Sequence, residues 1–305
     1  MKAKIRRAAL VLTALLGLST PLLADGPVEE KNLLSGKTKL DPGKGYILLR
    51  APYRTFGVFL RQPDATTVAE WEKERLEAFA KAQKKYPGKL KQWETDVAVA
   101  KQTKNKPPEK PAEPRLEDMQ VGAIELRDTV SFGPMFVFSK SETQFTYVNE
   151  VKPGTYIYYG PIMAVPGYPG TGACYCMGTV KFEVKAGEIT DLGNSLLALP
   201  KAEPPFDVAT QMLMADEAER KAKGKEPRVI QPALAYGVPE SLKALPARQA
   251  ELQASGKLNN YYGITISRIA PIPGVLGYRR DTVLDLRTGQ DVQNPPITTQ
   301  VKIKK

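Results

Sequence analysis

The sequence predicts a mainly β protein with α insertions, built as an antiparallel β-sandwich that carries a helical hairpin insertion and an irregular C-terminal segment. Three observations support this fold class. Short segments rich in Val, Ile, Tyr and Phe are separated by Pro-Gly or Ala-Gly turns, as is typical of antiparallel strands. Residues 68–100 instead repeat apolar side chains at the helical period. The last third of the chain is punctuated by proline.

The composition narrows the classes of function. The chain has 305 residues, of which 42% are hydrophobic, so it is long enough to bury a core. It contains no histidine, the residue on which most general acid–base catalysis, catalytic triads and zinc sites depend. It also has neither a Ser-x-x-Lys pair nor a Gly-x-Ser-x-Gly motif. We therefore expect no catalytic residue and no cofactor, and we predict that the protein is not an enzyme.

The N-terminus has the layout of a secretory signal peptide. Basic residues precede an apolar run over residues 8–18, and Pro21 ends this pattern. The run is shorter than the roughly 20 apolar residues that a membrane-spanning helix needs. We expect cleavage of residues 1–24 after Ala24, a flexible leader at residues 25–39, and a periplasmic or secreted product with no stable transmembrane span.

Residues 40–200 are expected to form the β-sandwich domain. Its predicted strands combine β-branched and aromatic side chains, and most of them begin or end at a turn that contains glycine. The predicted strands lie at residues 46–50, 55–60, 122–126, 135–138, 143–148, 155–159, 178–184 and 189–192.

A helical hairpin is predicted as an insertion at residues 64–115 of this domain. Trp71, Leu76 and Phe79 share one apolar face of a first helix, which Pro87 is expected to end. A second apolar stripe follows at residues 90–100 and predicts a second helix. Two consecutive helices joined by a short turn favour a hairpin.

The insertion is also the most basic part of the chain. Residues 81–110 hold nine lysines against Glu94, Asp96 and Glu109, an excess of six positive charges. Because an exported protein does not meet nucleic acid, the partner expected for this hairpin is an anionic component of the cell envelope. A lysine-rich helix surface that serves only solubility is the alternative. The oligomeric state is left open.

Residues 201–305 are predicted to form an α+β extension that ends in a strand pair. Helices are expected at residues 206–223 and 239–255, and the final strands at residues 262–269 and 282–286. Whether this extension is a separate domain is left open by the sequence.

Three segments share one sequence pattern of turn and strand residues. They read Pro-Gly-Lys-Gly-Tyr-Ile at 42–47, Lys-Pro-Gly-Thr-Tyr-Ile at 152–157 and Phe-Glu-Val-Lys-Ala-Gly-Glu-Ile at 182–189. In these segments the chain resembles uncharacterised exported β-sandwich proteins of the Gram-negative cell envelope. The resemblance covers about a third of the chain and leaves out the helical insertion and the C-terminal segment. It supplies no catalytic residue.

Cys174, Cys176 and Met177 form the most distinctive local cluster. Thiolate and thioether are ligands that Cu(I) prefers, which makes these three residues a candidate metal site. In an oxidising compartment Cys174 and Cys176 are equally a disulfide candidate. Two buried free thiols are the third state, and the sequence does not choose among the three.

Together these observations favour a non-catalytic binding or structural module of the cell envelope. A periplasmic Cu(I)-handling protein that uses Cys174, Cys176 and Met177 is the first alternative. A carboxylate-dependent hydrolase is the second, because acidic residues are plentiful although no spacing singles out a catalytic pair.

Overall fold

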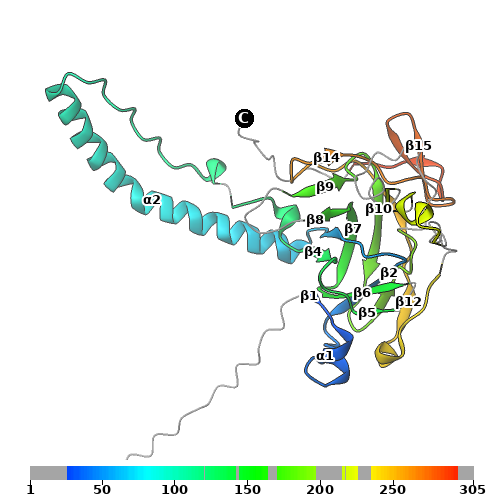
Figure 1. The fold of residues 1–305 in the computed structure, drawn as a ribbon. Coiled ribbons are helices and arrows are strands. Elements are labelled where there is room, and N and C mark those ends of the chain that lie inside the picture. Colours follow the sequence, from blue (N-terminus) through cyan, green and yellow to red (C-terminus); the bar gives the residue numbers. More distant parts are fainter. Residues whose placement is uncertain are drawn as a thin grey trace, which may run out of the picture.

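Strands arranged in several sheets make up most of the fold, and helices are few (Figure 1). The computed structural model describes residues 26–119, 121–141, 144–163, 170–196, 215–216, 218–225 and 235–294. The predicted signal peptide and most of the predicted helix at 206–223 lie outside these residues. The described part is mainly β, as the sequence predicts. None of its helices combines the length and the apolar character needed to cross a membrane.

The first large sheet, sheet A, has six strands in the order β1-β6-β2-β11-β12, with β5 also paired to β6. β11 runs parallel to both of its neighbours, whereas the other pairs are antiparallel. The expectation of a purely antiparallel arrangement is therefore wrong at β11. The strands are β1 (Gly26–Pro27), β2 (Gly45–Ala51), β5 (Ser139–Lys140), β6 (Phe145–Val151), β11 (Ile189–Asp191) and β12 (Ala247–Gln249).

The second large sheet, sheet B, has the order β13-β10-β7-β3-β4, and all of its pairs are antiparallel. The short turn after β10 explains the parallel strand in sheet A, because it carries the chain from sheet B to sheet A instead of closing a hairpin. The strands are β3 (Gly57–Arg61), β4 (Thr129–Phe132), β7 (Gly154–Gly160), β10 (Thr179–Val184) and β13 (Gln253–Ser255).

The C-terminal region is built into the same sheets. Strands β12 and β13 add an edge to sheet A and to sheet B, respectively. The predicted helix at 239–255 is wrong, since only a short 3₁₀ turn, η3 (Glu240–Leu242), precedes these strands. Strand pairing has overridden the local helical composition here. Residues 247–255 are thus part of the two large sheets.

Two three-stranded sheets complete the β structure, with the orders β14-β9-β8 and β15-β16-β17. The two segments predicted as a final strand pair do not pair with each other. β14 lies parallel to β9, and β16 lies between β15 and β17. The strands are β8 (Ile162–Met163), β9 (Thr171–Cys174), β14 (Thr265–Ile266), β15 (Leu276–Arg279), β16 (Thr282–Asp285) and β17 (Gln290–Asp291).

Three hydrophobic clusters lie on the two faces of the large sheets, because successive side chains of a strand point to opposite faces. In β2, Ile47 and Leu49 belong to a central cluster together with Phe59 and Phe182 of sheet B. Side chains on the other face of β2 join a second cluster with α1 (Glu30–Leu34) and η3. A third cluster covers the other face of β3 and contains both cysteines.

The predicted helical hairpin is replaced by one helix. α2 (Ala65–Gln102) has 38 residues and continues through Pro87. An internal proline removes one backbone hydrogen bond and costs about 3 kcal/mol, and the adjacent Gly88 is also a poor helix former. The helix nevertheless continues, and Tyr86 and Trp93 on either side of Pro87 donate hydrogen bonds to the backbone of residues 108–111. Figure 1 shows α2 leaving the sheets as a long projection.

Three other expectations are corrected by the structure. The leader predicted to be flexible is ordered from Gly26, because β1 pairs with β6 and the adjacent Val28 is buried. The predicted strand at 122–126 contains the 3₁₀ turn η2 (Ile124–Leu126). The predicted strand at 135–138 forms no strand, and Met135 is 80% exposed. The leader is ordered because it gains a partner strand in β6, whereas the other two segments form no strand because composition alone does not supply a partner.

Candidate functional site

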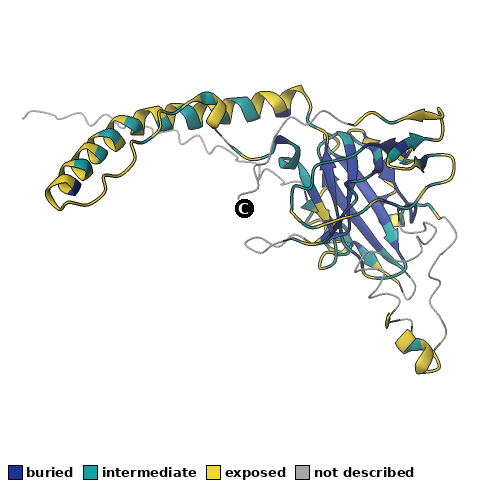
Figure 2. Ribbon diagram, turned by 90° about the horizontal axis from the view of Figure 1, so that it is seen from above, coloured by how far each residue is buried: buried dark blue, intermediate teal, exposed yellow. Residues whose placement is uncertain are grey.

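The most distinctive feature of the molecule is an arm formed by residues 65–123, which consists of α2 and the return segment at residues 103–123. The 38 residues of α2 span about 57 Å at the helical rise of 1.5 Å per residue. Of these residues only Thr67 and Ala100 are buried. In Figure 2 the arm is mostly exposed and stands clear of the buried strands.

The return segment runs back along one face of α2. Prolines at 107, 108, 111 and 114 keep this segment out of the helical conformation. The second helix of the predicted hairpin, at residues 90–100, is the distal part of α2. Side chains of α2 that lie one or more turns apart donate hydrogen bonds to its backbone carbonyls. These bonds join Trp93 Nε1 to Pro108 (3.0 Å), Tyr86 Oη to Pro111 (3.4 Å), Arg75 Nη2 to Leu116 (3.0 Å) and Trp71 Nε1 to Gly122 (3.1 Å).

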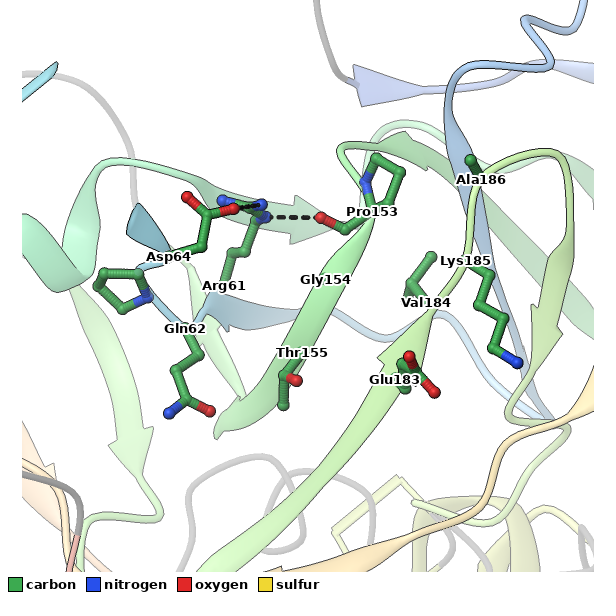
Figure 3. Close-up of a pocket in the computed structure, with 11 residues that line it drawn as sticks. Arg61, Gln62, Asp64, Pro153, Gly154, Thr155, Glu183, Val184, Lys185 and Ala186 are labelled. Carbon is green, nitrogen blue, oxygen red and sulfur yellow. Dashed lines mark hydrogen bonds and ion pairs between the residues drawn. The ribbon is translucent and has the colours of Figure 1, made fainter. Parts of the chain in front are cut away.

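The arm is attached to sheet B through the last residue of β3. Arg61 is only 8% exposed, and its guanidinium forms ion pairs with Asp64 and with Asp128 (3.1 Å). Its Nε donates to the carbonyl of Pro153 at 2.9 Å. Figure 3 shows Arg61 between Asp64 and Pro153. Lys152 forms a further ion pair with Asp128 at 2.8 Å.

The same residues start the helix. Asp64 is the N-cap of α2, and its carboxylate accepts a hydrogen bond from the backbone N–H of Thr67 at 2.9 Å. Arg61 also donates to the hydroxyl of Thr67 at 3.0 Å. We call Arg61, Asp64, Thr67, Asp128 and Lys152 the base of the arm. It fixes the direction of the first turn of α2 relative to sheet B.

Electrostatics keep the base ionised. The backbone hydrogen bond from Thr67, together with Arg61, lowers the pKa of Asp64 from its ordinary value to about 2. Burial alone would raise the pKa of Asp128, but the hydrogen bond and the charge of Lys152 outweigh it and lower that pKa. Burial alone would lower the pKa of Arg61, but the hydrogen bond to Asp64 and the charges of Asp64 and Asp128 together outweigh it and raise that pKa. All three groups are therefore charged at neutral pH.

Beyond the base, a second set of contacts holds the next turns of the helix. Both Nη atoms of Arg127 donate to the carboxylate of Glu74, at 2.7 and 2.6 Å. The guanidinium of Arg75 lies over the ring of Trp71, 5.5 Å from its centroid. The proximal part of the arm is thus held at several points, whereas Tyr86 and Trp93 in its distal part bind the return segment of the arm itself.

A cavity of about 590 Å³ lies beside the base, between the start of β7 and the end of β10. The guanidinium of Arg61 uses its three nitrogens for bonds within the protein, so we assign it to holding the arm. The close-up in Figure 3 shows the residues around this cavity. Its lining residues are Arg61, Gln62, Pro63, Asp64, Pro153, Gly154, Thr155, Glu183, Val184, Lys185 and Ala186.

Charge is divided unevenly along the arm. Residues 65–80 hold four glutamates against Lys73 and Arg75, whereas residues 81–110 have an excess of six positive charges. The basic half is the distal one. Lys101, Lys104 and Lys106, at the end of α2 and in the turn beyond it, are all exposed.

The cysteine cluster forms a buried disulfide. Cys174 and Cys176 are joined with a Cα–Cα distance of 5.2 Å, and their exposed fractions are 0% and 3%. The Sγ of Cys176 lies 3.6 Å from the hydroxyl of Tyr159. Met177 is half-buried, and its backbone N–H donates to the carbonyl of Ser267 at 3.0 Å. Because a metal binds the thiolate, a bonded pair of sulfurs offers no such ligand.

The described acidic residues do not gather into a metal-binding cluster. Among them and the cysteines there is no group of three residues able to hold a metal ion. Asp191 is buried, and this burial raises the pKa of its carboxyl. It accepts hydrogen bonds from the backbone N–H groups of Gly193 (2.7 Å) and Gly237 (2.6 Å), so it joins two chain segments.

Sequence reasoning located the basic arm but missed its base. Asp64 followed by Thr67 and a long helical pattern is a readable N-cap signal. The roles of Arg61, Asp128 and Lys152 depend on the pairing of β3 with β4 and β7, which no local pattern specifies.

Comparisons of this chain with protein-family models, with curated proteins and with solved structures found no match.

Proposed function

We propose that this protein is an exported, non-catalytic binding or structural module that presents its basic arm to an anionic component of the cell envelope. In this proposal sheets A and B pack face to face as a sandwich. We call the two sheets the body, and the arm is attached to it. The central cluster, which combines alternate residues of both sheets, supports the sandwich.

One observation carries the functional proposal: the arm is fixed at its base and basic at its far end. The ion pairs of the buried Arg61 with Asp64 and Asp128 hold the first turn of α2, while the lysines of the distal half are exposed. A lysine near an anionic membrane surface contributes about 1 kcal/mol of attraction. Several exposed lysines at the end of a fixed projection therefore favour an extended polyanionic surface over a small ligand.

Export is the second part of the proposal. It rests on the basic start, the apolar run at 8–18 and the break at Pro21. Protein isolated from the envelope should have Asp25 as its first residue. An intact mass that still includes residues 1–24 would contradict both the cleavage and the location.

Binding is tested by removing charge from the tip alone. The triple variant Lys101→Gln, Lys104→Gln, Lys106→Gln should bind phosphatidylglycerol-containing vesicles and purified lipopolysaccharide at least about tenfold more weakly than the natural protein. A matched triple variant on the body, Lys37→Gln, Lys39→Gln, Lys185→Gln, removes the same charge from exposed positions and should bind nearly normally. Cosedimentation at low and high salt measures both.

Equal losses in the two triple variants would show that only net charge matters and would reject the arm as the binding element.

The arm can also be removed as a whole. Its two ends are close, since Arg61 and Asp128 are in contact, so a short Gly/Ser linker can replace residues 65–123. The shortened chain should fold and lose the binding.

A further inference from the structure

In the described part of the chain, the face of α2 on the side away from the return segment consists of exposed residues. Ala69, Leu76, Ala80 and Pro87 recur there at spacings of seven and four residues, which places them in one lane along the helix. All four are exposed, and Leu76 keeps 52% of its surface in solvent. A lane of this spacing is the pattern with which helices pack against one another.

A row of charges lies beside this lane. Glu70, Glu77, Lys84 and Lys91 follow one another at intervals of seven residues, so they occupy one stripe, with acidic residues nearer the base and basic residues nearer the tip. All four side chains are exposed. None of them forms an ion pair within the described residues.

Interactions inside the helix do not account for this order. Residues seven apart are about 10.5 Å apart along the axis, so Glu77 cannot reach Lys84. The helix dipole favours acids only in the first turn and bases only in the last, and it acts weakly on Glu77 and Lys84 in the middle. Glu70 also acts on Arg127, and Glu77 lies one turn from Lys73 and from Lys81, but these local interactions do not involve the stripe as a whole. All four charges would be matched together by another molecule whose charges run in the opposite direction.

From this face we infer that a second copy of the chain binds α2, with the two helices antiparallel. The stripe is symmetric about the position between residues 80 and 81. A two-fold axis at that position puts Glu70 opposite Lys91 and Glu77 opposite Lys84, twice each. In the antiparallel second copy the same charges run in the opposite direction, so each acidic residue of one helix faces a basic residue of the other. This inference goes beyond the proposed function and uses different lysines from those of the tip.

Charge reversal with rescue tests the pairing. Sedimentation velocity of the full processed chain at low salt should show a reversible dimer. The variant Glu70→Lys, Glu77→Lys and the variant Lys84→Glu, Lys91→Glu should each weaken self-association at least about tenfold, because each places like charges opposite each other. The fourfold reversal should restore it to near the natural value. Circular dichroism checks that each variant keeps its helix.

Cysteine cross-linking tests the direction. Ala80→Cys lies beside the expected axis and should form a disulfide-linked dimer under mild oxidation, whereas Ala98→Cys should not. Linking at both positions would indicate parallel helices and would overturn the inference. So would a natural chain that stays monomeric at high concentration and low salt, or a dimer that survives both reversals. Vesicle binding by the tip is measured separately, so either proposal can fail alone.

Discussion

The body and the arm are stabilised in different ways. In the body, large side chains are completely buried, among them Phe59, Tyr158 and Phe182. The arm buries almost none of its 38 helical residues and is held by ion pairs and side-chain hydrogen bonds. The two regions therefore need not unfold in one transition, because burial of apolar surface makes a core cooperative and isolated polar contacts do not.

The chain contains two tryptophans, and this makes the comparison measurable. Trp71 and Trp93 both lie on α2, so tryptophan fluorescence reports on the arm. The buried tyrosines of the strands dominate the near-ultraviolet circular dichroism of the body. Tryptophan fluorescence and near-ultraviolet circular dichroism therefore follow the unfolding of the arm and of the body independently.

The largest effect is expected in the central cluster. Phe182→Ala should lower the free energy of unfolding of the body by about 3–5 kcal/mol, because the ring is buried against Phe59 and Tyr156 and leaves a cavity. The matched change in the arm, Trp93→Ala, should leave the body transition unchanged. Chemical denaturation followed by both signals measures the two. A Trp93→Ala variant that destabilises the body equally would show that the arm belongs to the main core.

The next effect is expected at the base. Arg61→Ala should destabilise the attachment of α2 by about 2 kcal/mol, because it removes the charged hydrogen bonds to Asp64 and to the largely buried Asp128, which keeps its ion pair with Lys152. The tryptophan transition should then move to lower denaturant concentration and separate from the tyrosine transition. Arg127→Ala removes an exposed ion pair and serves as the control, with a much smaller shift expected.

Acid should loosen the base before it affects the core. Asp64 has a pKa lowered to about 2, and the pKa of Asp128 is also lowered. A lowered pKa adds stability above the ordinary value, and this stability is lost as the pH falls from about 4 to about 2. Tryptophan fluorescence should therefore change in that window, and Asp64→Asn should remove most of the change.

Asp191 in sheet A should respond with the opposite sign. Burial raises its pKa, so protonation favours the folded body, and its contribution to stability grows as the pH falls through that pKa. Asp191→Asn should remove this pH dependence of the stability of the body.

For the arm, an acid response that is identical in the natural protein and in the Asp64→Asn variant would mean that the base of the arm is not its source.

The smallest effect is expected at the disulfide. Replacing Cys174 and Cys176 together by alanine should cost less than the roughly 2–4 kcal/mol typical of bridges that close longer loops, because a bridge across one residue restricts the unfolded chain very little. Both transitions should stay close to their natural positions. A collapse of the body would show that the segment packed on the disulfide depends on it.

Local patterns predicted the parts of the fold that local physics determines. The alternation in residues 178–184 and the aromatic run at 155–159 became β10 and β7, since a period of two is visible in the sequence itself. Pairing partners were not visible. The parallel position of β11 and the edge strands β12 and β13 depend on residues far apart in the chain.

The candidate site shows the same division. The lysine excess of the arm is a count of residues and was found directly. Pro87 was expected to end the helix by a local rule that its surroundings overrule. Arg61 gave no signal, because its role arises only when β3, the turn before β7 and the start of α2 meet. A charged residue at a strand end is otherwise an ordinary surface residue.

The place of β11 in sheet A determines when this chain can fold. β2 is synthesised early, but its neighbours are β6 and β11, so both of its edges wait for segments made much later. Sheet B gains its last strand only at Gln253–Ser255. Pairings so distant in sequence form slowly, and unpaired strand edges invite aggregation in the meantime. Neither large sheet can therefore be completed before residues 247–255 have been made, so the strands made first depend for their final neighbours on the last third of the chain.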